Sequence, residues 1–525
     1  MCNLSPCLFG SLLPGESGAI GFGAKGFGAN DFRGKGFGVR RVATGWLLVL
    51  GVLFFTTGYA GAGESSPIAD AMQAGRLDRV DALLDGREVD IDAAQADGMT
   101  ALHWAVYRDD LAGTEMLLEA GADANVTNRY GVPPLSLACQ NGSAAIVKRL
   151  LEAGADANAE LRGGETVLMT AARTGVAEVV QALIARGAKL NAAERNSQTA
   201  IMWAAAAGHA DVVDALMDAG ADFRASLPSG FNPFFFAVRE GRVDVVLRLL
   251  AAGVDVNEPI DPQRKAGKGP AQGTSALLLA VENGHFELAE VLLREGADAA
   301  DQRLGYTALH AITWVRKPLR GDGDPPPIGS GRTSSLELVR SLVAHGADVN
   351  ARHGKHPTGN YRLNRTGATP FLLAAETGDL PLMKLLLDLG ADPTIVNADN
   401  VTPLLAASGV GVLGNGDETA GTEEEAIEAI QLLLDLGADI NAVDDQGKTA
   451  MHGAAFKSWT KLIQFLADHG ADVNVWNRKN SRGWTPLLIA QGNRPGNFRP
   501  SAETIEAVER VMRAAGVEPP EGASP

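Results

Sequence analysis

From about residue 65 to residue 517, the chain repeats one pattern of small, apolar and polar positions. A Thr-Ala-Leu-His-type string, best preserved at Thr100, Thr307 and Thr449, opens a short run of small and apolar residues. A second, leucine-rich run follows and ends at a Gly-Ala-Asp tripeptide or a close variant. Each copy therefore predicts two short amphipathic helices joined by a turn.

The glycines of the tripeptide give the length of the repeat. They are Gly121, Gly154, Gly187, Gly220, Gly253, Gly296, Gly346, Gly390, Gly437 and Gly470. Five of the nine intervals between them are 33 residues, and the other four are longer by 10 to 17 residues. With degenerate copies at 66–86 and 485–516, we count about twelve units. Since one unit cannot bury its own apolar face, stability must come from stacking.

Within a unit, the residue types suit their expected places. Thr100 can cap the first helix with its hydroxyl, and Gly121 can end the second helix in a left-handed conformation. The 33-residue period and the T-A-L-H string resemble the ankyrin repeat. The resemblance implies an all-α repeat solenoid of helix-turn-helix units with β-hairpin or loop fingers. It also implies that His103, His310 and His452 hydrogen-bond neighbouring backbone and serve the scaffold.

Two flanking segments are expected to lie outside the array of residues 65–517. Residues 1–39 form a Gly/Phe-rich, low-complexity N-terminus with too few apolar side chains to build a core. Residues 518–525 are expected to form a disordered tail. Because the basic region of a signal peptide ordinarily opens a chain, we also expect translation to begin at Val39.

Residues 40–62 have the order of a secretory signal peptide. An arginine pair precedes an apolar run from Trp46 to Phe55, and small residues including Ala60 and Ala62 follow. We predict export and cleavage after Ala60 or Ala62. An uncleaved anchor formed by residues 42–62, which would just reach across a bilayer, is the alternative.

Insertions interrupt the regular period at 258–273, 316–333, 351–367, 409–425 and 492–501. Insertions in repeat proteins form loops and often mark a binding face. Basic residues concentrate in these insertions and in residues 476–500, and those that we expect to contact a partner are Arg352, Lys355, Arg362, Arg365, Arg482 and Arg499. The alternative is that these arginines only keep long loops soluble. Segment 409–425 is acidic instead, which favours a solvated helix start.

The resemblance also implies a concave groove, formed by the ends of the first helices and the tips of the fingers. Mapped onto this chain, its residues are Tyr107, Arg108, Arg129, Tyr130, Arg162, Arg173, Arg195, Phe231, Arg239, Tyr306 and Trp314. Tyr, Trp and Arg dominate binding hot spots, and exposed aromatic side chains have no core to serve. At least two of Phe234, Phe235 and Phe236, which open a first helix, should be core.

Composition and motifs restrict the function. The chain is 46% hydrophobic with a net charge of −17, which excludes a disordered chain and argues against a dedicated nucleic-acid binder. Only Cys139 lies in the repeats, so neither an internal disulfide nor a cysteine metal site is expected. The repeats contain no catalytic motif, and we expect no enzyme activity, cofactor or metal.

The sequence therefore predicts a monomeric, non-catalytic scaffold of the bacterial periplasm or cell envelope. It would bind another protein, one with an acidic patch, through the groove and the basic insertions. The alternative function is an envelope enzyme or a binder of an anionic small molecule. In that case Arg362, Arg365, Arg482 and Arg499 would converge on a pocket that contains His353 or His356.

Overall fold

The computed structural model describes residues 66–86, 89–263, 271–318, 327, 329–354, 363–411, 421–493 and 499–520. The predicted signal peptide, its alternative as an anchor and the Gly/Phe-rich segment lie outside these residues, as does most of the predicted tail. Among the described residues, no helix is long and apolar enough to cross a membrane.

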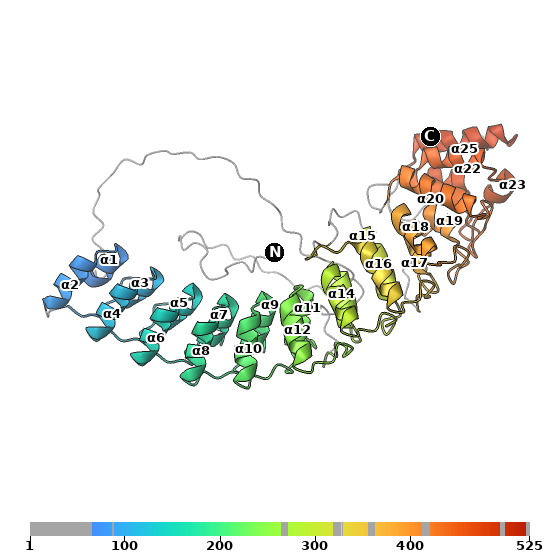
Figure 1. Cartoon of the computed structure of the whole chain (residues 1–525). Coiled ribbons are helices and arrows are strands. Elements are labelled where there is room, and N and C mark those ends of the chain that lie inside the picture. Colours follow the sequence, from blue (N-terminus) through green and yellow to red (C-terminus); the bar gives the residue numbers. More distant parts are fainter. Residues whose placement is uncertain are drawn as a thin grey trace, which may run out of the picture. The chain divides into compact units, whose positions relative to one another are not determined.

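In the described part of the chain, twelve helix pairs follow one another, and their order can be followed in Figure 1. The first (inner) and second (outer) helices of units 1 to 12 are α1 (Pro67–Gln73) and α2 (Leu77–Asp85), α3 (Ala101–Tyr107) and α4 (Leu111–Glu119), α5 (Pro134–Asn141) and α6 (Ala144–Glu152), α7 (Val167–Thr174) and α8 (Ala177–Ala185), α9 (Ala200–Ala207) and α10 (Ala210–Asp218), α11 (Pro233–Arg239) and α12 (Val243–Ala251), α13 (Ala276–Glu282) and α14 (Phe286–Arg294), α15 (Ala308–Arg316) and α16 (Ser335–Ala344), α17 (Pro370–Glu376) and α18 (Leu380–Asp388), α19 (Pro403–Ala407) and α20 (Glu423–Asp435), α21 (Ala450–Lys457) and α22 (Thr460–Asp468), and α24 (Pro486–Ala490) and α25 (Ala502–Ala514). A single turn, α23 (Val473–Trp476), precedes the last pair. Each inner helix packs on the inner helix of the next unit, so the predicted all-α solenoid is confirmed.

The Thr-His pair that opens several inner helices is a structural cap. The Thr100 hydroxyl accepts from the His103 N–H at 3.4 Å, and His103 Nδ1 accepts from the Thr100 N–H at 3.2 Å. The neutral ring therefore donates from Nε2 to the Val132 carbonyl of the next finger, at 3.0 Å. His310 and His452 repeat this arrangement, and burial lowers their pKa to about 3 and about 4. The scaffold role of the three histidines is confirmed.

The core is continuous through the array because both helices of every unit contribute apolar side chains. Leu292 on α14, which has no exposed surface, is an example of the buried leucines on the outer helices. Phe234, Phe235 and Phe236 at the start of α11 are all buried, which confirms the prediction for this run and extends it to all three.

Among the described residues the fingers between units are loops, which is one of the two forms that the resemblance implied. They contain no strand and only an isolated bridge between Glu160 and Thr166. Asparagine side chains link the units instead: Asn125 Nδ2 donates to the Gly154 carbonyl at 2.9 Å, and Asn125 Oδ1 accepts from the Asp156 N–H at 2.8 Å. The same pair of bonds forms at Asn158, Asn257, Asn350 and Asn441. At these five positions a side-chain amide thus links one unit to the next.

Residues 329–334, at the C-terminal end of the insertion between α15 and α16, contact two earlier units, and we call them the strap. The Ser330 N–H donates to Nδ1 of His285 at 3.1 Å, and Ser330 Oγ reaches the Gly241 carbonyl of unit 6 at 3.5 Å. The Arg332 N–H donates to Glu287 on α14 at 2.7 Å. The strap therefore covers the turns of units 6 and 7 and was not foreseen as a bracing element.

The other end of the same insertion reaches forward. Arg316 binds Asp379, the N-cap residue of α18, through two hydrogen bonds of 2.7 and 3.0 Å, and it donates to Ser335 at 2.5 Å. Lys317 Nζ lies 2.7 Å from the carboxylate of Glu425 on α20. Both cations are thus paired with carboxylates within the array. The insertion of unit 8 thus connects units 6 to 10.

The described ends of the 409–425 insertion are also ordered by the array. Thr422 caps α20, and the Glu425 carboxylate accepts from the Thr422 N–H at 2.9 Å. The acids at the start of this helix complement its dipole, as predicted. On the other side, the Gly411 carbonyl accepts from the Leu363 N–H at 2.5 Å.

Candidate protein-binding surface

Tyr107, the first predicted groove residue, pairs with Trp104 at the end of α3. The rings of Tyr107 and Trp104 meet edge to face with centroids 5.6 Å apart, and Trp104 donates to the side chain of Gln95 in the preceding finger at 2.8 Å. Tyr107 keeps 54% of its surface exposed, and Tyr130 at the next fingertip keeps 38%. Arg108 beside them is exposed and contacts the Gln73 carbonyl at 3.4 Å. These tyrosines are exposed, as predicted.

A second cluster joins α7 and α9. The guanidinium of Arg173 lies 5.0 Å from the centre of the Trp203 ring and 3.4 Å from the carboxylate of Glu165. Sequence reasoning named Arg173 but missed Trp203 and Trp104. Both tryptophans stand four residues after the N-cap residue of an inner helix, and this shared position is the signal that could have found them.

Phe231 departs from the prediction. It is only 6% exposed and packs against Phe236, with ring centroids 5.3 Å apart. Arg239 covers both rings at 5.2 and 5.1 Å. The expectation that Phe231 is exposed to a partner is wrong, because Phe231 packs against the buried phenylalanines at the start of α11.

A third cluster lies between units 7 and 9. The rings of Tyr306 and Trp314 meet edge to face at 5.2 Å, and the Tyr306 hydroxyl donates to Glu282 at 2.8 Å. Arg365 lies 5.1 Å over Trp314, and the buried His353 stacks on Tyr306 at 5.6 Å. Tyr306 and Trp314 are therefore half-buried within a mutual aromatic and cationic stack.

The basic insertion residues do not form one compact site among the described residues. Arg365 covers Trp314, and Arg482 covers Trp484. The two arginines lie in fingers that are several units apart along the chain. Arg352 donates to the Val396 carbonyl at 2.7 Å, and Arg499 is exposed. Lys355, Arg362 and His356 lie outside the described residues. The structure therefore gives no support to the anion-binding alternative.

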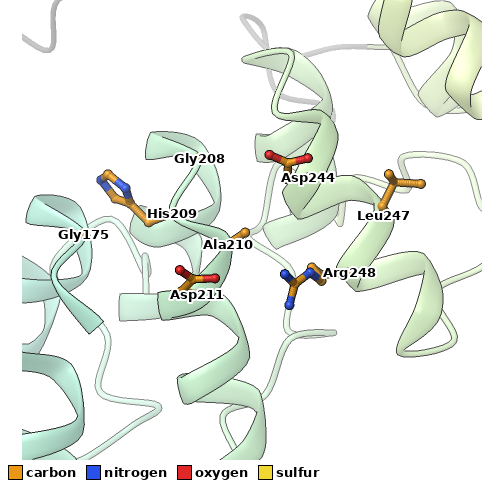
Figure 2. A pocket seen from close by; sticks show the side chains of 8 residues that line it. All are labelled: Gly175, Gly208, His209, Ala210, Asp211, Asp244, Leu247 and Arg248. Atoms are coloured by element: carbon orange, nitrogen blue, oxygen red, sulfur yellow. The ribbon is translucent and has the colours of Figure 1, made fainter. Parts of the chain in front are cut away.

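A shallow hollow of about 400 Å³ opens between the first turns of α10 and α12 (Figure 2). Asp211 and Asp244 line it, each in the first turn of its helix, where a carboxylate complements the helix dipole. His209 Nε2 is bonded to the Arg173 carbonyl at 2.9 Å, and Arg248 is paired with Asp214. Each of these groups has a structural role, so the hollow offers no catalytic constellation.

Two nucleophilic side chains are buried. Burial raises the pKa of the Cys139 thiol, which keeps it protonated and unreactive. Lys457 is 3% exposed, its pKa is lowered by burial to about 8, and its Nζ lies 4.3 Å from the Trp459 ring. Neither group lines the hollow between α10 and α12. Among the described residues, no cluster of His, Cys, Asp and Glu could hold a metal ion.

Comparison with known proteins agrees with this architecture. The family described as "Ankyrin repeats (3 copies)" matches residues 54–128, 113–194, 135–226, 168–260, 235–316 and 420–499, and the single "Ankyrin repeat" matches 366–398. Such repeats are generally non-catalytic binding modules.

Curated relatives share the repeats. Human "Ankyrin repeat and SOCS box protein 6" is 32% identical over 260 residues, which cover 47% of this chain and 44% of that protein. Mouse "B-cell lymphoma 3 protein homolog" is 30% identical over 221 residues, 42% of this chain and 40% of that protein. Arabidopsis thaliana "E3 ubiquitin-protein ligase KEG" is 28% identical over 288 residues, 42% of this chain and 16% of that protein. The chain thus spans less than half the length of these relatives. Because the family matches well over half of its residues, the chain belongs to the ankyrin-repeat family.

Proposed function

We propose that this protein is a non-catalytic, monomeric scaffold that binds another protein through the inner-helix groove. The observation that carries the proposal is the pair of exposed tyrosines in units 2 and 3, Tyr107 at 54% and Tyr130 at 38%. A large amphipathic ring that neither packs in the core nor pairs with another unit is what a protein partner desolvates at a hot spot.

The clusters around Trp104 and Trp203 strengthen the proposal. Each cluster combines a tryptophan ring with a tyrosine or an arginine, and contacts inside the array fix the orientation of these side chains. Pre-oriented side chains lose little entropy on binding, which favours affinity. Repeat stacking places such clusters along one side of the inner helices, as an extended binding surface requires.

We propose that the protein is exported and works in a bacterial periplasm or cell envelope. Support comes from residues 40–62, in which an arginine pair, an apolar run and small residues follow one another as in a signal peptide. Retention in the inner membrane through residues 42–62 is the alternative location.

The groove proposal is tested by binding to a captured partner. The tagged full chain is used as bait in envelope extract, and the affinity of each captured protein is then measured for the wild type, Tyr107→Ala and Leu436→Ala. Leu436 is 46% exposed at the end of an outer helix and is the matched control. We expect Tyr107→Ala to weaken binding by about 2 kcal/mol and Leu436→Ala to have no effect. Equal affinities for all three proteins would refute the groove as the binding surface.

A further inference from the structure

Three arginines occupy one repeated position at adjacent fingertips. Arg129, Arg162 and Arg195 each stand four residues before the N-cap residue of an inner helix, and all three are exposed. Their spacing in the sequence is 33 residues. The Arg129 N–H bonds to the Asp97 carbonyl and the Arg195 N–H to the Gly163 carbonyl, both at 3.0 Å, so neighbouring fingertips are in contact. We call these three residues the arginine row.

Two of these side chains are held along the row. Arg129 donates to the Ala96 carbonyl of the preceding fingertip, and Arg162 donates to the Arg129 carbonyl at 3.1 Å. A guanidinium has five N–H donors, so each arginine keeps most of its donors toward solvent. Its long side chain is nevertheless already oriented, which lowers the entropy cost of binding an anion.

The charges of the row are not neutralised within the array. In the part of the chain that the structure describes, no carboxylate forms an ion pair with Arg129, Arg162 or Arg195. Later arginines at the same position are different: Arg303 pairs with Asp301 at 2.9 Å, and Arg365 covers Trp314. In a protein of net charge −17, three adjacent uncompensated cations are a distinct feature.

We propose that the arginine row binds an extended acidic segment of a protein partner, with carboxylates at about every third residue. Neighbouring helices pack about 10 Å apart, and an extended chain advances about 3.3 Å per residue, so three residues span one unit. Tyr130, exposed beside Arg129, adds an aromatic contact that suits a polypeptide. At the same position of the next two units stand the uncharged residues Pro228 and Ala271, so the row ends at Arg195 in unit 5. This inference rests on the proposed scaffold function.

Two synthetic peptides of identical composition test the register. Both contain four glutamates and eight serine or glycine residues; the glutamates lie at every third position in one peptide and are adjacent in the other. Binding to the full-length protein is measured by fluorescence anisotropy at low salt. We expect the spaced peptide to bind about fivefold more tightly than the clustered one. Replacing all three row arginines by Gln should weaken the spaced peptide about tenfold, and added salt should reduce this difference.

The matched control removes the same charge elsewhere. Arg79, Arg340 and Arg510 are exposed on outer helices, and replacing all three by Gln should change the affinity less than twofold. Equal affinity of the two peptides, or equal weakening by the two triple variants, overturns the inference. A single-stranded oligonucleotide that binds more tightly than the spaced peptide overturns it too, because the row would then be a general polyanion surface. If neither peptide binds while a captured partner still depends on Tyr107, the inference falls and the proposed function stands.

Discussion

Loss of the Arg316–Asp379 pair should destabilise the middle of the array far more than loss of a surface pair. The Asp379 side chain is 1% exposed and that of Arg316 is 19% exposed, and two hydrogen bonds of 2.7 and 3.0 Å join them. Removing one member of a buried pair costs about 3–5 kcal/mol, because the remaining charge stays desolvated. Since Arg316 is partly hydrated, we expect Arg316→Met to cost about 2–4 kcal/mol; methionine retains much of the apolar stem.

The assay is equilibrium urea unfolding combined with native-state hydrogen exchange, which locates the loss within the array. Exchange should accelerate in α15 to α18. The control is Arg248→Met, which breaks the ion pair of Arg248 (side chain 47% exposed) with Asp214 (31% exposed). This variant should lose at most about 1 kcal/mol of stability. If Arg316→Met is no more destabilising than Arg248→Met, our account of the insertion as a brace is wrong.

The strap can be tested separately from the ion pair. A Cβ atom added at Gly329 would lie 1.5 Å from the Gly284 carbonyl oxygen, so Gly329→Ala must displace the strap. Exchange should then accelerate around His285 in unit 7, two units away from Asp379. No change in protection there would show that the strap contributes nothing to these turns.

Three further predictions concern the core, pH and export. Leu292→Ala should cost about 2–5 kcal/mol, measured as a shift of the urea midpoint, because the side chain is fully buried on α14. The free energy of unfolding should fall as pH drops below about 6.5, by about 1.4 kcal/mol per pH unit for each buried histidine. The reason is that these histidines are protonated in the unfolded chain, whereas in the folded protein His310 and His452 stay neutral until about pH 3 and 4. His310→Gln should reduce this slope, measured by urea titrations at pH 7 and 5. The intact mass of the exported protein should correspond to cleavage after Ala60 or Ala62, whereas a membrane-bound species that retains the preceding apolar run would indicate the anchor.

The fold could be predicted from the sequence because each unit carries its own local signals. Thr100 predicts a cap and Gly121 a left-handed helix end, and both follow from backbone geometry within a few residues. No such local signal indicates which residues an insertion contacts. Ser330 contacts His285, 45 residues earlier, and Gly241, 89 residues earlier, and spacing along the chain does not indicate such contacts.

The candidate surface was predictable only in part for a related reason. The 33-residue period indicates which side chains lie on the groove side, but it does not show which of them pack together. Phe231 has the residue type of a binding anchor, yet the neighbouring Phe236 and Arg239 cover it. Tyr107 has no such covering neighbour and stays exposed. Burial of an aromatic ring therefore depends on cross-unit packing, which a single repeat does not contain.

The residues proposed to bind a partner and the contacts that brace the insertions lie in different parts of the array. The exposed tyrosines and the arginine row lie in units 2 to 5, where the period is 33 residues and no insertion occurs. The ion pair of Arg316 and the strap lie in units 6 to 10. Because coupling in a solenoid passes mainly between neighbours, Arg316→Met should lower stability and leave partner affinity unchanged. Tyr107→Ala should do the reverse. A parallel loss of affinity and stability in both variants would mean that the two halves act as one cooperative unit.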